Sequence, residues 1–193
     1  MNRKLLAIVA VAAVLALLAG AAVGRNLLSS AATPPSARGA GVVRFKDPVA
    51  KVSIAYPASW RRLPERPGDP DLALLVAEDD STSLLMRVST SGLDPVTTEG
   101  LPVVRKYTDG LVSVDPRAKQ LVEPVAVQVG GLPGWRYRYT FGSGTEAGAH
   151  DHYFLFKGRR LIQLVFQAVP ASKLPAAAPG FDRIAATFQG NDA

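Results

Sequence analysis

The distribution of apolar residues divides the chain into two unlike parts. An uninterrupted apolar run extends from Leu5 to Gly24 and contains no charged residue. From about Arg44 onward, apolar and polar residues alternate in short segments, as they do in a folded domain. Between the two, residues 25–41 are rich in Ser, Ala, Pro and Gly, and this composition predicts a flexible linker.

The apolar run is long enough to cross a membrane as a helix. About twenty residues, rising 1.5 Å each, reach roughly 30 Å, the thickness of a hydrocarbon core. Arg3 and Lys4 precede the run and predict a cytoplasmic N-terminus, with the folded domain outside the cytoplasm. Small residues from Ala19 to Ala22 also fit a cleavage site, so residues 1–24 are either a signal anchor or a signal peptide.

Alternating segments predict strands in the rest of the chain. In Trp135–Phe141 aromatic side chains alternate with Arg136, Arg138 and Thr140, and we expect the aromatic side to be core. The glycine-rich segment 130–134 before it predicts a turn. The other expected strands are 52–56, 71–77, 84–90, 120–129, 150–157 and 161–169.

Two segments have the helical period. Asp94 and Pro95 predict the start of the first helix, as N-cap and first helical residue, and it should end near residues 110–116. The second is expected at 179–189 and should bury Phe181 and Phe188. The order of strands, helix, four strands and helix predicts an α+β fold, a twisted antiparallel sheet flanked by helices.

Charge and composition narrow the possible partners. The formal net charge is +6, but from Phe45 onward 17 basic residues face 16 acidic ones, so the predicted domain is nearly neutral. The excess of basic residues lies beside the apolar run, where it can contact lipid head groups. No basic stripe with interleaved aromatic residues appears, which argues against nucleic-acid binding. The chain has no cysteine, which excludes disulfides, thiol chemistry and lipid attachment at cysteine.

The candidate catalytic and metal-binding residues are few. No serine lies in a G-x-S-x-G turn, and no other catalytic motif stands out, so we expect a non-catalytic protein without a cofactor. His150 and His152 would point to one side of a strand, where two imidazoles can bind a metal. Such a site needs a third ligand, such as Glu146; the alternative is a polar entry to a strand.

Two further groups of charged residues are candidates. The pairs Arg61-Arg62 and Arg159-Arg160 can dock on an acidic partner or on lipid head groups, or they serve only solubility. The acidic pairs Asp79-Asp80 and Asp69-Asp71 lack the ligand spacing of a calcium loop, so we interpret them as solvated turns.

Several segments together resemble the PsbP-like domains. Residues 52–60, VSIAYPASW, are similar to the opening strand of that family, which ends in a Tyr-Pro pair followed by Trp. The turn 131–134, the aromatic strand 135–141 and the closing segment 181–188 are similar to its middle hairpin and last helix. The resemblance covers roughly Val43 to Gln189.

The resemblance implies an α/β/α sandwich over residues 42–193, after the hydrophobic N-terminal helix, and a mostly non-catalytic role. We therefore expect a membrane-tethered domain outside the cytoplasm that docks on, or helps to assemble, a membrane or envelope complex. If residues 1–24 are cleaved, the protein is secreted. The alternative is a carrier or sensor at the cell surface that binds a small ligand or a metal.

Overall fold

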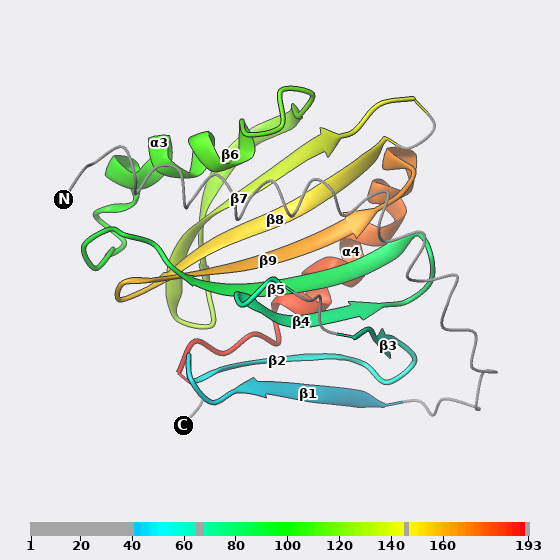
Figure 1. Ribbon diagram of the computed structural model, residues 1–193, viewed down its shortest axis with the longest axis horizontal. Helices are drawn as coiled ribbons and strands as arrows, with labels where there is room; N and C mark the ends of the chain where they lie inside the picture. Colours follow the sequence, from blue (N-terminus) through cyan, green and yellow to red (C-terminus); the bar gives the residue numbers. More distant parts are fainter. Residues whose placement is uncertain (1–40, 65–67, 145–146, 192–193) are drawn as a thin grey trace.

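The computed structural model describes residues 41–64, 68–144 and 147–191, and the expected hydrophobic helix within residues 1–24 lies outside these ranges. None of the helices in the described ranges is long and apolar enough to span a membrane. There, antiparallel strands form a sheet in the order β3-β4-β5-β9-β8-β7-β6, and a hairpin of β1 and β2 lies next to its β3–β4 edge (Figure 1). The strands are β1 (Val42–Asp47), β2 (Val52–Pro57), β3 (Arg61–Arg62), β4 (Leu72–Ala77), β5 (Thr82–Thr90), β6 (Lys119–Val129), β7 (Leu132–Phe141), β8 (Gly148–Lys157) and β9 (Arg160–Ala168).

Tight turns fix the register of the β6–β9 half of the sheet. Gly130 and Gly131 join β6 to β7 with φ angles of 58° and 81°, as a two-residue hairpin turn of type I′ requires. Gly158, with φ of 56°, serves the turn between β8 and β9. The turn predicted at residues 130–134 is therefore confirmed, although β7 already begins at Leu132.

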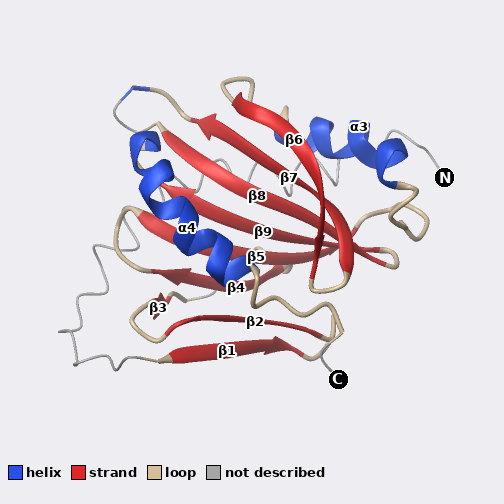
Figure 2. Ribbon diagram, turned by 180° about the vertical axis from the view of Figure 1, so that it is seen from behind, coloured by secondary structure: helices blue, strands red, loops and turns tan. Residues whose placement is uncertain are grey.

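Two helices cover opposite faces of the sheet (Figures 1 and 2). The first, α3 (Leu101–Val112), packs on β7, and we call its side the α3 face. The second, α4 (Leu174–Ala185), follows the short 3-10 helix η2 (Ala171–Lys173) and packs on β9, β8 and β2 on the α4 face. The mostly antiparallel sheet with its two helices confirms the predicted α+β class and the layer order implied by the resemblance.

Where the helices pack, strand β8 buries apolar side chains on both of its faces. Along β8, Tyr153 and Leu155 point to the α4 face, while Phe154 and Phe156 point to the α3 face, and all four are buried. The aromatic strand behaves as predicted: Tyr137, Tyr139 and Phe141 are buried, and β7 also carries Trp135 on that side.

The helix starts differ from the prediction. Helix α3 begins at Leu101 behind Gly100, and Asp94 instead accepts a bond from Arg159, so the predicted start at Asp94-Pro95 is wrong. Pro102 occupies the first turn of α3, where its missing N–H costs nothing. Helix α4 begins at Leu174, about one and a half turns before the predicted start, and contains Pro179 in its interior. Burial of Leu174 and other apolar residues of α4 compensates the single backbone bond that this proline removes.

Candidate functional site

A row of polar side chains crosses the α3 face where apolar residues would be expected. Arg87 of β5 lies opposite Gln163 of β9, His152 of β8 is diagonal to Gln163, and Tyr139 of β7 lies opposite His150 of β8. We call these five residues the polar row. Each of them is at most 5% exposed. Buried polar side chains in a protein normally find hydrogen-bond partners, so the contacts of each member decide what the row can do.

At the β5 end of the row, Arg87 is paired with two carboxylates. Its Nη1 donates to Asp69 Oδ2 at 2.8 Å, and its Nη2 lies 3.6 Å from Asp71. The positive charge is therefore compensated, which a buried guanidinium requires. The pair Asp69-Asp71 is thus not the solvated turn expected from the sequence, because the Asp69 side chain is buried against Arg87. Arg87 Nε and Asp69 Oδ1 remain buried without a hydrogen-bond partner among the described residues.

At the other end, the two histidines share one tyrosine hydroxyl. Tyr139 Oη lies 3.0 Å from His152 Nδ1 and 3.2 Å from His150 Nδ1. The rings stack on Phe141 and Phe154, with centroid distances of 4.2 and 3.8 Å. Burial lowers the pKa of His150 to about 4, and burial, together with His150, lowers the pKa of His152 well below its usual range. Both imidazoles are consequently neutral at pH 7.

The hydrogen-bond roles of the two imidazoles depend on their tautomers. His150 Nε2 lies 3.2 Å from Gln167 Oε1, and the Nδ1 atoms of both histidines face the Tyr139 hydroxyl. Burial raises the pKa of Tyr139, so its hydroxyl keeps the proton that it donates within this group.

Two atoms in the middle of the row, His152 Nε2 and Gln163 Oε1, are buried without a hydrogen-bond partner among the described residues. The contact with Gln163 opposes the fall in the pKa of His152. With Arg87 Nε and Asp69 Oδ1, four buried polar atoms on this face have no partner among the described residues, which makes the polar row the candidate site.

The two histidines lie on one face, as predicted for a metal pair. Their ring centroids are 6.5 Å apart, and both Nδ1 atoms point to Tyr139 rather than to each other. The described part of the chain contains no group of three or more His, Cys, Asp or Glu residues that could hold a metal ion. Glu146, the expected third ligand, lies outside the described residues. Metal binding by His150 and His152 therefore stays a prediction.

The two arginine pairs lie at opposite ends of the sheet. Arg61 and Arg62 form β3, where Arg61 lies 3.9 Å from Asp80, while Arg62 lies 5.3 Å from the centre of the Phe45 ring. Arg159 and Arg160 lie at the turn between β8 and β9, at the far end of the strands. The four arginines do not form one patch, and docking through either pair stays a prediction.

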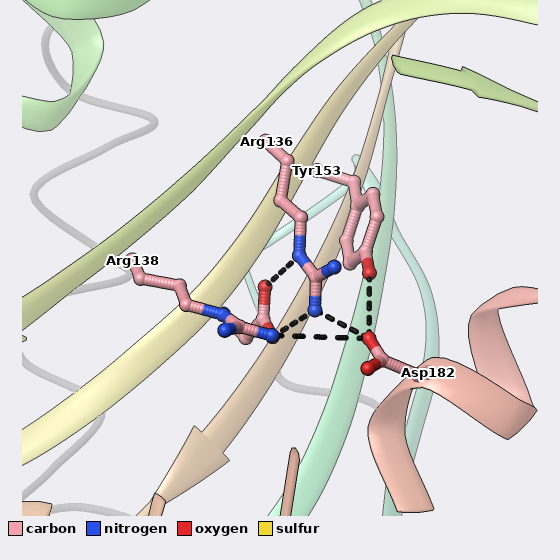
Figure 3. A network of polar contacts seen from close by, with 5 residues as sticks. Arg136, Arg138, Tyr153 and Asp182 are labelled. Atoms are coloured by element: carbon pink, nitrogen blue, oxygen red, sulfur yellow. Dashed lines mark hydrogen bonds and ion pairs between the residues drawn. The ribbon is translucent and has the colours of Figure 1, made fainter. Parts of the chain in front are cut away.

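A second charged cluster, on the α4 face, joins β7, β8 and α4 (Figure 3). Asp151 is fully buried and accepts from Arg136 Nε at 2.7 Å and from Arg138 Nε at 3.0 Å. Arg136 also bonds Asp182 of α4 and lies over the Tyr153 ring, 4.8 Å from its centre. Every charged group here has a partner, so the cluster ties α4 to the sheet.

Sequence reasoning missed Arg87 and Gln163. The signal was present: each is a lone polar residue inside an apolar strand, Arg87 in LLMRV and Gln163 in LIQLVF. An isolated polar residue in a buried strand indicates a specific partner. Their juxtaposition with His152 depends on strand order, because β5 and β9 are far apart in the sequence.

The comparisons with known proteins show the fold. A scan against family models finds no match, and a search of curated proteins finds none either. Among solved structures, the chain is similar to cyanobacterial PsbP, CyanoP, of Synechocystis sp. PCC 6803, with 14% identity and a TM-score of 0.60 over 83% of this chain and 98% of that one. It is also similar to LpqN of Mycobacterium tuberculosis, with 15% identity and a TM-score of 0.55 over 78% and 86% of the two chains.

A further neighbour is the Ran-binding protein Mog1p of Saccharomyces cerevisiae, at 9% identity and a TM-score of 0.50 over 80% of this chain and 97% of that one. The chain thus has the PsbP-like fold, and the resemblance drawn from its motifs is confirmed at this level. At such identities the likeness concerns the fold alone.

Proposed function

We propose that this protein is a membrane-tethered, non-catalytic domain outside the cytoplasm that docks on, or helps to assemble, a membrane or envelope complex. The observation that carries the proposal is the apolar run from Leu5 to Gly24 in front of a domain with the PsbP-like fold. Residues 25–41 would be the linker and residues 42–193 the folded domain. The anchor would cross the membrane once; if it is cleaved, the same domain is released.

The structural neighbours support a binding role rather than a catalytic one. LpqN is involved in cell envelope biogenesis, and Mog1p binds Ran. In this chain the charged cluster around Asp151 serves the attachment of α4, and both histidines are buried away from solvent at 2% exposure. These features favour recognition of a partner without chemical turnover.

A cross-linked pull-down of the full-length protein from its own membranes tests this proposal. A stoichiometric membrane or envelope partner is expected. The matched control lacks residues 1–41 and should lose its membrane location and most of the partner. If the full-length protein is recovered alone at native expression, the complex-associated role is wrong.

The four unmatched polar atoms of the polar row and Asp69 favour a second candidate function, a small-ligand carrier or sensor. Native mass spectrometry of the purified protein would then show a bound molecule. His152→Leu and Gln163→Leu should lose it, whereas Gln128→Leu on exposed β6 should keep it. A protein without bound mass, or equal retention in all three variants, would exclude this second function.

A further inference from the structure

Two turns that are distant in the sequence meet at one end of the molecule (Figure 1). The turn between β1 and β2 presents its backbone carbonyls to the end of the β8–β9 hairpin. Lys157 Nζ donates to the carbonyl oxygens of Ala50 and Lys51, both at 2.8 Å, and Arg160 Nη1 donates to that of Val49 at 2.8 Å. These three bonds hold the two turns together as one surface.

This surface is strongly basic. Lys51, Lys157, Arg159 and Arg160 lie within it, and we call these four residues with Val49 the basic tip. The carbonyls that Lys157 and Arg160 bind are neutral, so these bonds compensate none of the charge. Desolvation, followed by the positive charges of Arg160 and Lys51, lowers the pKa of Lys157, as expected for cations crowded together.

The acidic residues nearby compensate the tip only in part. Asp47 accepts the backbone N–H groups of Val49 and Ala50, at 2.9 and 2.8 Å, and so shapes the turn. Asp94 pairs with Arg159 at 3.1 Å, but both side chains are largely exposed, so the pair is weak in water. Four cations therefore face two carboxylates, and the tip keeps a net positive charge.

The basic tip also exposes an apolar side chain and a strained backbone. Val49 is 73% exposed, and its carbonyl oxygen accepts from Arg160. Lys51 has φ of 53°, in the left-handed region that glycine adopts without strain. A lysine in such a conformation is an outlier of the kind that clusters at functional positions.

The opposite end of the sheet carries both signs and has no comparable excess of cations. There the β4–β5 turn carries three consecutive exposed carboxylates, Glu78, Asp79 and Asp80, beside three cations, Arg61, Arg62 and Lys173. Thr82 and Thr90 mark the two ends of β5, which separate the acidic turn from the basic tip by roughly 27 Å at 3.4 Å per residue. The described domain is therefore charged unevenly along its strands, although its total charge is small.

We propose that the basic tip docks the folded domain on the anionic phospholipid surface of the membrane. The cations would lie over lipid phosphates, Val49 would reach the interface, and the acidic turn would point away. Charge complementarity favours lipid as the occupant, because the tip combines clustered cations with one exposed apolar side chain. The expected linker of 17 residues (25–41) spans up to about 58 Å when extended, more than the roughly 20 Å of β1 between Val42 and the tip.

The inference goes beyond the proposed function, because it concerns a contact of the folded domain itself and needs no protein partner. It is tested on the full chain, reconstituted in vesicles of phosphatidylcholine with or without phosphatidylglycerol. The natural chain has no cysteine, so Val49→Cys places an environment-sensitive dye at the tip alone. Asp80→Cys places the same dye on the acidic turn as a control.

The dye at residue 49 should shift to the blue only in vesicles that contain phosphatidylglycerol, and high salt should reverse the shift. The dye at residue 80 should not respond. Equal signals at residue 49 in both lipids, or equal responses at both sites, would overturn the proposal. A missing partner in the pull-down would leave this result unaffected, so the two proposals fail separately.

Variants that remove single charges from the basic tip test the proposal further and should leave the fold intact. Lys51→Gly removes a charge and relieves the left-handed strain, and Arg159→Gln removes an exposed charge that pairs with the equally exposed Asp94. Each change should weaken the response to anionic lipid about fivefold. Arg62→Gln, at the other end of the sheet, should leave it unchanged, and an equal loss in this variant would contradict a localised tip.

Discussion

Both faces of the sheet bury charged side chains, but the two faces differ in how completely these side chains are paired. On the α4 face, Asp151 is fully buried, and its two oxygens accept bonds from Arg136 and Arg138. On the α3 face, Arg87 and Asp69 also form a buried ion pair, but each keeps an atom without a partner among the described residues. Every charged group of the α4-face network has a partner. On the α3 face, Gln163 and His152 next to the Arg87–Asp69 pair also have buried atoms without a partner among the described residues.

This difference separates a structural network from a candidate binding site. A complete network has a structural role, because its bonds offset the cost of burying the charges. Buried polar atoms without a protein partner are open to a ligand or to ordered water, so the α3 face is the candidate binding face. If this interpretation is right, substitutions on the two faces should affect stability very differently.

The largest effect is expected from Asp151→Asn. The substitution leaves Arg136 and Arg138 without their buried counter-charge, and the free energy of unfolding should fall by about 3 to 5 kcal/mol. Chemical denaturation measures this loss in the free energy of unfolding. Asp182→Asn, at a half-exposed carboxylate in the same cluster, should cost less than about 1 kcal/mol. Similar losses for both variants would contradict a central role of Asp151.

Low pH should reduce the free energy of unfolding, because His150 and His152 on the α3 face are buried in their neutral form. The unfolded chain protonates His150 near its ordinary pKa of 6.5, whereas the folded chain does so only near pH 4. The unfolded state therefore binds more protons in this window, and the free energy of unfolding should fall on the order of 3 kcal/mol from pH 6.5 to 4. His152 acts in the same direction.

Denaturation of His150→Gln at several pH values isolates this contribution. The variant should lose the part of the slope between pH 6.5 and 4 that His150 contributes, while His152 still contributes its part and the carboxylates titrate alike in both proteins. An unchanged slope would show that His150 is not buried and neutral.

A smaller effect is expected where α3 meets the sheet. Tyr137 Oη donates to Asp109 at 2.7 Å and lies 2.6 Å from Thr108 Oγ1. Tyr137→Phe removes both contacts but keeps the ring, so the free energy of unfolding should fall by about 1.5 kcal/mol. Hydrogen exchange should show faster opening of α3, with α4 unchanged. Uniform loss of protection would mean that the two helices do not open independently.

The smallest effect is expected from Gln163→Leu. Gln163 Oε1 has no hydrogen-bond partner among the described residues, so an apolar side chain of similar size should change the free energy of unfolding by less than about 1 kcal/mol. Thermal denaturation of Gln163→Leu and Asp151→Asn in parallel compares the two faces directly. A large loss of stability would show that Gln163 is structural and would remove the polar row as a binding site.

The amino-acid sequence determined much of the fold, because alternation and turn chemistry act over short distances. The strand Trp135–Phe141, the Gly130-Gly131 turn and the apolar face of α4 could all be predicted. The helix starts could not, because Asp94 and Pro95 form a good local start signal, whereas in the fold Leu93 and Val96 pack against the α3 face and the helix begins only at Leu101.

The candidate sites were decided by tertiary structure. The sequence placed His150 and His152 on one face of a strand, as the two-residue period dictates. It could not show that Arg87 and Gln163 lie across the sheet from them, because the order β5-β9-β8-β7 brings together strands that are distant in the chain. Nor could it show that Lys157 and Arg160 reach the turn at Val49, more than 100 residues earlier. Local periodicity determines which side a residue faces, and only the pairing of distant strands determines what it meets there.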